Sequence, residues 1–236
     1  MSARDDVLRA IQARLGPTPE SPALPAGEVP ARPPPLGNRA ARIATFSAAL
    51  TAVGGRVHRV ADDGEAARVL QELAQGRGWR RLARSDAARL QPLCDALQDV
   101  FWIEPTPFPA DPEARAPLFE CDAGLSTCQA AVAETGTLVL DSSRELHRLA
   151  SLVPPVHVAL LDAAAIVEDL GALFTGLAAQ EPPPTLTLVT GPSRTADIEL
   201  ELVMGVHGPA ELHVLLVDGP GSVHGDRCRP ASGTPE

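Results

Sequence analysis

Apolar and polar positions alternate along the chain at two spacings, and these spacings predict the order of helices and strands. Segments with apolar residues at helical spacing are each followed by a short apolar run typical of a strand, with helices expected at 42–55, 64–75 and 87–97 and strands at 56–60, 79–84 and 99–105. Such alternation is typical of a parallel sheet whose two faces are covered by helices. We therefore predict an α/β fold with a mostly parallel sheet flanked by helices.

The middle of the chain departs from this alternation. Two apolar strands within residues 128–143 flank Glu134-Thr135-Gly136, which predicts a hairpin or β-turn in which the glycine supplies a permissive backbone. Helix and strand then alternate again, with strands expected at 156–161, 185–189 and 212–218 and a helix at 163–177.

Residues 197–205 fit two interpretations. Ile198, Leu200 and Leu202 alternate as in a strand, whereas Thr195 followed by acidic residues is typical of a helix start. We expect the helix, because the helix dipole stabilises an acidic side chain in the first turn.

The two ends of the chain have their own patterns. Residues 3–15 carry apolar side chains at helical spacing, and the Pro-rich tract 16–37 cannot continue a helix. We predict an N-terminal helix and Pro-rich arm over 1–37, an α/β domain over 38–218 and a flexible tail over 219–236. The helix is free to dock on a partner or on another copy of the chain, so a homo-oligomer stays open.

Composition narrows the class of protein. The 236 residues are 44% hydrophobic and 21% charged, which is typical of a globular chain with a sizeable core. The net charge of −10 argues against nucleic acid as a partner. No stretch approaches the roughly 20 apolar residues that span a bilayer, and the first residues lack an apolar signal core. We expect a cytoplasmic protein without a membrane span.

The four cysteines argue against a metal centre built on thiolates. Cys94, Cys121, Cys128 and Cys228 form no Cys-x-x-Cys pair, and iron–sulfur clusters need closely spaced thiolates. We expect neither a cluster nor a metal site on this chain.

The stretch TGPSRTADIE, directly after an expected strand, is a candidate anion site. Gly191 permits close backbone approach, Ser193 and Thr195 add hydroxyls, and Arg194 has the fork geometry for a carboxylate or phosphate. Helix N–H groups would complete such a site. The alternative is structural: Thr195 caps a helix, and Asp197 satisfies its dipole and pairs with Arg194.

Four further residues are candidates for chemistry. Glu134, in the turn between two apolar strands, is a general base if it lines a cleft and a hydrated turn residue otherwise. His157, after a diproline, titrates near neutrality and is either an acid–base group or a hydrogen-bonded core residue. Arg148 precedes it as a candidate anion-binding residue. His207, between two glycines, is exposed in a tight turn, and its spacing gives little support to a metal site.

Three motifs together resemble a known family. AETGTLVL, R-x-x-S-x-x-P-P-x-H-V and TGPSRTADIE…GVHGPAELHVLLVD, in this order and spacing, are similar to the LUD-domain family of lactate utilization proteins. The resemblance covers roughly residues 40–218 and is most specific over 190–217. It implies a fold similar to that of ribose-phosphate isomerases, glucosamine-phosphate deaminases and CoA transferases.

The resemblance also implies a function and a grouping of residues. It implies a role beside two iron–sulfur partner proteins that oxidise L-lactate to pyruvate, so that this chain needs no cofactor of its own. It brings no catalytic residue that can be transferred. It does imply that the junction at 191–199 surrounds one cleft together with Glu134, Arg148, His157 and His207.

Three hypotheses follow. The first is a component of a lactate-oxidising system in which Arg194 or Arg148 holds a small carboxylate and His157 or Glu134 accepts a proton. The second is a stand-alone enzyme for a sugar phosphate or an acyl-CoA, by analogy of fold. The third is a non-catalytic module whose motif residues are structural caps. We favour the first.

Overall fold

The computed structural model describes residues 3–15, 36–103, 116–146, 148–178, 183–196, 202–204 and 208–219. The chain divides into two units, residues 1–34 and residues 35–236. The first unit contains helix α1 (Ala3–Leu15), which confirms the predicted N-terminal helix. Val7, Leu8 and Ile11 are exposed on it. The second unit contains all the other helices and strands of the described residues.

A six-stranded parallel sheet forms the centre of the second unit, in the order β1-β12-β7-β4-β2-β3. Its strands are β1 (Arg56–Val60), β2 (Arg81–Arg84), β3 (Phe101–Ile103), β4 (Ala123–Cys128), β7 (Val156–Asp162) and β12 (Glu211–Val217). Every residue of β7 is buried, as expected for a central parallel strand covered on both faces. The predicted α/β fold is confirmed, but the central strand β4 was not predicted.

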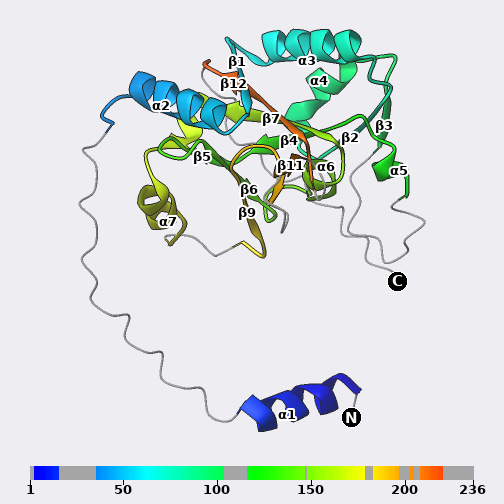
Figure 1. The fold of residues 1–236 in the computed structure, drawn as a ribbon, viewed down its shortest axis with the longest axis vertical. Coiled ribbons are helices and arrows are strands. Elements are labelled where there is room, and N and C mark those ends of the chain that lie inside the picture. Colours follow the sequence, from blue (N-terminus) through cyan, green and yellow to red (C-terminus); the bar gives the residue numbers. More distant parts are fainter. Residues whose placement is uncertain are drawn as a thin grey trace, which may run out of the picture. The chain divides into compact units, whose positions relative to one another are not determined.

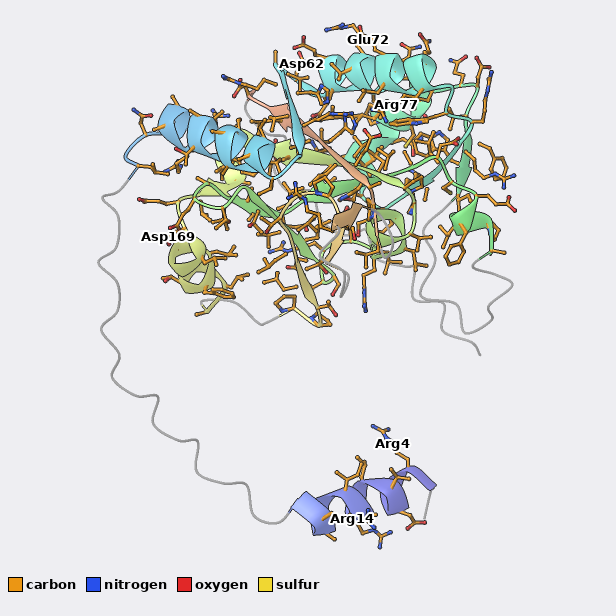
Figure 2. The ribbon with its side chains drawn as sticks, in the orientation of Figure 1. Arg4, Arg14, Asp62, Glu72, Arg77 and Asp169 are labelled. Atoms are coloured by element: carbon orange, nitrogen blue, oxygen red, sulfur yellow. The ribbon has the colours of Figure 1, made fainter. Side chains whose placement is uncertain are left out.

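One face of this sheet is covered by α3 (Asp63–Arg77) and α4 (Gln91–Asp95), with a short 3-10 helix, η1 (Ala88–Leu90), before α4 (Figure 1). The sequence sets both ends of α3. The Asp62 carboxylate accepts a hydrogen bond from the Glu65 amide at 2.8 Å, and Gly78 ends the helix with a left-handed backbone (φ 66°). Figure 2 shows Asp62 and Asp169 beside the amino ends of α3 and α7.

The opposite face packs against α2 (Arg39–Ala52) and a second sheet. That sheet has the order β8-β5-β6-β9 and consists of β5 (Ala130–Val132), β6 (Thr137–Asp141), β8 (Ile166–Val167) and β9 (Leu186–Val189). Strands β5 and β6 pair antiparallel, which confirms the hairpin predicted around Glu134. Phe46 and Leu50 of α2 are fully buried between the elements of this core.

Short elements complete the unit: α5 (Ala116–Phe119), α6 (Arg148–Leu152), η3 (Ala163–Ala165), α7 (Leu170–Ala178), β10 (Arg194–Ala196) and β11 (Leu202–Met204). Helix α6 lies directly on β4, because a Cβ atom at Gly124 would come 1.8 Å from the Ala150 carbonyl oxygen. In the described part of the chain, no helix combines the length and apolar character needed to cross a membrane.

Two predicted helices are wrong in whole or in part. The helix expected at 163–177 begins only at Leu170, because Ile166 and Val167 form a β-strand and Asp169 then caps the helix through the Ala172 amide (2.7 Å). The helix expected after Thr195 is contradicted where the structure describes this segment, since β10 (to Ala196) pairs antiparallel with β11 (Leu202–Met204). Residues 197–201 and the tail from 220 lie outside the described residues.

Candidate functional site

A pocket of about 220 Å³ lies where the amino ends of β7 and β12 meet β9 and the loop that follows β9. Its lining consists of Ser151 and Leu152 of α6, His157, residues 187–193, Gly208, Pro209 and Leu212. Hydroxyl groups and aliphatic side chains alternate around it. A site of this size suits a small molecule better than a drug-sized ligand, whose pockets measure roughly 300–1,000 Å³.

Both arms of the motif TGPSRTADIE…GVHGP contribute to the pocket. The Ser193 amide donates to the Pro209 carbonyl oxygen at 2.8 Å and holds the two arms together. Gly191 has a φ of 87°, and a Cβ atom there would lie 2.9 Å from Cγ2 of Val53. This glycine is therefore required by its backbone conformation and by close packing on the end of α2, and its position places Pro192 and Ser193 in the lining.

His157 lines the pocket and is 1% exposed. Its Nε2 lies 2.8 Å from Oγ of Ser126 on the neighbouring strand β4. The diproline before β7 fixes the start of the strand, because the Pro155 carbonyl oxygen accepts the Ala210 amide at 2.8 Å. Of the described residues in the lining, His157 is the one with an imidazole, the side chain most often used as an acid–base group.

A short series of hydroxyls links the pocket to the hairpin turn. Thr190 Oγ1 lies 2.7 Å from Thr137 Oγ1, which lies 2.6 Å from Thr135 Oγ1. Gly136 has a φ of 66°, and a Cβ atom there would come 2.3 Å from the Leu50 backbone nitrogen, so the turn packs against α2. Glu134 in this turn is exposed and is not part of the pocket lining.

The structure does not place the predicted cationic residues in the pocket. Arg194 is exposed, and its Nη2 donates to the Val53 carbonyl oxygen at 2.6 Å, where it satisfies the carboxyl end of α2. Arg148 begins α6 and is also absent from the lining. His157, Gly191 and Ser193 share one pocket, whereas Glu134, Arg148 and Arg194 lie outside its lining.

Three predicted positions stay untested. Thr195 lies in β10, and nothing is described of its side chain. Asp197 and His207 lie outside the described residues. They follow β10 and β11 respectively, close in sequence to the two arms that line the pocket.

A buried carboxylate that the sequence analysis did not single out lies away from the pocket. Glu145 is 4% exposed and accepts hydrogen bonds from Ser85 Oγ (2.9 Å), the Thr127 amide (3.1 Å) and Gln129 Nε2 (3.3 Å). Burial raises the pKa of Glu145 to about 7 although these donors favour its charged form. No sequence pattern points to this residue, since an acid in a polar segment after a strand is common.

A stacked histidine pair lies between β1 and β12. His58 Nε2 is 3.0 Å from His213 Nδ1, and the rings are 5.2 Å apart. Burial lowers the pKa of His213 to about 4, and the neighbouring His58 and two arginines act in the same direction. Glu211 lies 3.4 Å from His213 and forms a two-bond pair with Arg77 (2.8 Å each). The histidine pair His58–His213 is neutral at physiological pH.

Metal ligands do not gather within the described ranges, where no group of three or more His, Cys, Asp or Glu side chains could hold an ion. Cys94, Cys121 and Cys128 are buried and form no disulfide, and burial raises the pKa of Cys121 to about 11. Such thiols are poor metal ligands, because the thiolate is the binding form.

Comparison with known proteins adds a family. The LUD domain model matches residues 43–217. An uncharacterized protein of Neisseria meningitidis serogroup B is 34% identical over 77% of this chain and 79% of its own length. Proteins named lactate utilization protein C are 39% identical in Deinococcus radiodurans and 33% identical in Bacillus subtilis, over 45% and 42% of this chain. These two matches span about half or less of the relatives' own length, 51% and 43%.

A solved structure agrees with the fold. The crystal structure of a DUF162 family protein from Deinococcus radiodurans superposes with a TM-score of 0.57 and 26% sequence identity. It covers 77% of this chain and 99% of its own. The described α/β architecture is therefore shared with a solved protein over nearly the full length of that protein.

Proposed function

Because the chain belongs to the LUD domain family, we propose that it is a component of a system that oxidises L-lactate to pyruvate together with iron–sulfur partner proteins. Its similarity to proteins named lactate utilization protein C supports a role in lactate utilization. The observation that carries the proposal is the pocket, which His157 lines together with residues of both arms of the motif TGPSRTADIE…GVHGP. We expect the assembly to work in the cytoplasm.

The pocket suits a three-carbon hydroxy acid. The hydroxyls of Ser193 and Thr190 can donate to a carboxylate, and the aliphatic lining can pack on a methyl group. His157 is within the lining to accept the proton of the substrate hydroxyl. Conversion of lactate to pyruvate releases two electrons and two protons. The electrons then pass to redox groups on the partner proteins, and none is required on this chain.

The lining disfavours the alternative of a phosphate-bearing substrate. A phosphate dianion is usually held by arginine, lysine or several free backbone amides. Arg194 and Arg148 both lie outside the lining, and the Ser193 amide is already bonded to Pro209. No observation favours a sugar phosphate or an acyl-CoA over a small carboxylate.

Affinity purification of the chain from native cells grown on lactate tests the proposal. We expect iron–sulfur proteins to co-purify, and we expect the isolated chain to show no lactate oxidation with a dye acceptor. L-lactate should raise the unfolding midpoint of the chain. From the concentration dependence of this shift, the apparent affinity for L-lactate should be at least about tenfold weaker in His157→Gln. Lactate turnover by the isolated chain, or purification without iron–sulfur proteins, would contradict the proposed division of labour.

A further inference from the structure

Glu145 is a buried carboxylate between two strands of the large sheet. Ser85 directly follows β2 and Thr127 belongs to β4, and both donate to its carboxylate oxygens. Gln129 donates to the same carboxylate and accepts the Asp141 amide at 2.7 Å through its own Oε1. Glu145 thus joins the carboxyl ends of β2 and β4, and Gln129 extends the connection to the end of β6.

The position of Glu145 coincides with the topological switch point of the sheet. From β2 the chain continues to β3 on one side, whereas the next strand of this sheet after β4 is β7 on the other side, reached through β5 and β6 of the second sheet. Open α/β sheets form a crevice between two such strands at their carboxyl ends. Here the Glu145 carboxyl occupies that crevice, so the segment that carries it closes the gap between the strands.

The same segment leads into the pocket wall. Helix α6 begins three residues after Glu145 and supplies Ser151 and Leu152 to the pocket. It has little room to shift sideways, because it lies on Gly124 without space for a side chain. The Leu146 amide donates to the Asp86 carboxylate at 2.6 Å, which adds a second attachment beside Glu145.

We propose that Glu145 is a positioning residue whose buried carboxyl, bonded to Ser85, Thr127 and Gln129, holds α6, and with it the pocket wall of Ser151 and Leu152, in place. The proton leaves to solvent when the carboxyl ionises, and the buried charge then favours release of the segment. This inference concerns regulation of the pocket on which the proposed function rests.

Burial and nearby negative charge favour the neutral form of Glu145, whereas its hydrogen-bond donors favour the charged form. From the segment after β2 it faces Asp86, and from β4 it faces the buried Cys128 thiol. On its own segment, Arg144 lies 3.8 Å from Asp141. The hydrogen-bond donors to Glu145 in the described structure are a hydroxyl, an amide and a side-chain amide, none of them charged. Burial, the largest cause, and then Asp86 raise its pKa toward about 7, whereas the three donors lower it.

We call the hold of the Glu145 carboxyl on its own segment and α6 the latch. Hydrogen–deuterium exchange of the full chain at pH 6 and pH 8 tests this latch without any ligand. If the carboxyl titrates at about 7 when closed and in its ordinary range when released, opening becomes about tenfold more favourable between these two pH values. After correction for intrinsic rates, we expect residues 142–152 to exchange about tenfold faster at pH 8. Residues of β12, on the other side of β7, should not respond.

Variants separate positioning from simple stability. Glu145→Gln keeps the shape and mimics the neutral carboxyl, so its exchange should match the wild type at pH 6 and lose the pH dependence. Ser85→Ala removes a donor to the charged form, so the midpoint of the pH dependence should move upward. Glu72→Gln, on the exposed outer side of α3, is the matched control and should behave as the wild type (Figure 2).

Titration of L-lactate by calorimetry at both pH values then distinguishes the two proposals. Exchange that follows Glu145 while lactate binds at neither pH would support the latch and contradict the proposed function. Lactate binding with no Glu145-dependent change in exchange would overturn the latch and leave the function intact. Unchanged pH dependence in Glu145→Gln would also overturn it.

Discussion

At the scale of single residues, the same side-chain types serve different purposes according to what surrounds them. His157 faces a pocket and contacts one hydroxyl, whereas His213 is enclosed between β1 and β12 with a second ring and an ion pair. Glu134 is exposed, and Glu145 is buried with three donors. The chemical role of each of these side chains is therefore set by neighbours distant in sequence.

His213 should make stability depend on acid. Its pKa of about 4 in the folded chain lies below the ordinary 6.5, so the unfolded chain binds more protons between these values and stability is lost as the pH falls. Between pH 7 and pH 5 this group alone accounts for about 2 kcal/mol. Urea unfolding at both pH values should show that the free energy of unfolding falls by about 2 kcal/mol less in His213→Gln than in the wild type. Glu145 has the opposite pH dependence, but it is present in both proteins and cancels in the comparison. Equal losses would contradict the assignment.

Gly136 should tolerate no side chain. An added Cβ would meet the Leu50 backbone nitrogen at 2.3 Å, and its φ is positive, so Gly136→Ala should cost more than about 2 kcal/mol. Gly76, inside α3, has no atom within 4 Å of an added Cβ, and Gly76→Ala should stabilise by about 0.5–1 kcal/mol. Thermal unfolding of the two variants checks the difference, and similar midpoints would show that α2 yields to the turn.

At the scale of elements, sequence periodicity predicted those whose pattern reflects burial. Strands β1 and β12 and helix α3 follow from spacing and capping residues alone. Strand β4, with sequence AGLSTC, could not be found in this way, because its glycine and serine are explained by contacts with other elements. Gly124 leaves room for α6, and Ser126 contacts His157. The contact of Arg194 with the Val53 carbonyl oxygen could not be predicted for the same reason, because it depends on where α2 ends, some 140 residues earlier.

Arg194→Ala therefore tests an element boundary and leaves the pocket lining intact. The guanidinium satisfies the carboxyl end of α2, so its loss should cost about 0.5–1 kcal/mol of stability. Stabilisation by L-lactate should be unchanged, in contrast to His157→Gln. A loss of the lactate effect in Arg194→Ala, measured by thermal shift, would return the anion site to this arginine.

At the scale of the whole molecule, two sheets share one domain, and this decides where a ligand can lie. The pocket follows the carboxyl end of β9 in the small sheet, yet it lies at the amino ends of β7 and β12 in the large one. The carboxyl ends of β2 and β4, where open sheets usually bind ligands, are closed by Glu145. A sequence analysis that expects one sheet cannot separate these two edges.

The second unit should fold without the first. The four hydrophobic clusters of the described chain draw their residues from position 36 onward. A chain beginning at Pro35 should unfold cooperatively, with a midpoint within about 2 °C of the full chain. Calorimetry checks this, and a large drop in midpoint would show that residues 1–34 contribute to the stability of the second unit.

The linked hydroxyls of Thr135, Thr137 and Thr190 have a consequence for sensing. Each carries a single proton, so the three O–H bonds run either all toward the turn or all toward the pocket. A guest that accepts from Thr190 selects the second direction, and a guest that donates selects the first. The direction of the O–H bond of Thr135 would thus depend on whether the molecule in the pocket is an acceptor or a donor.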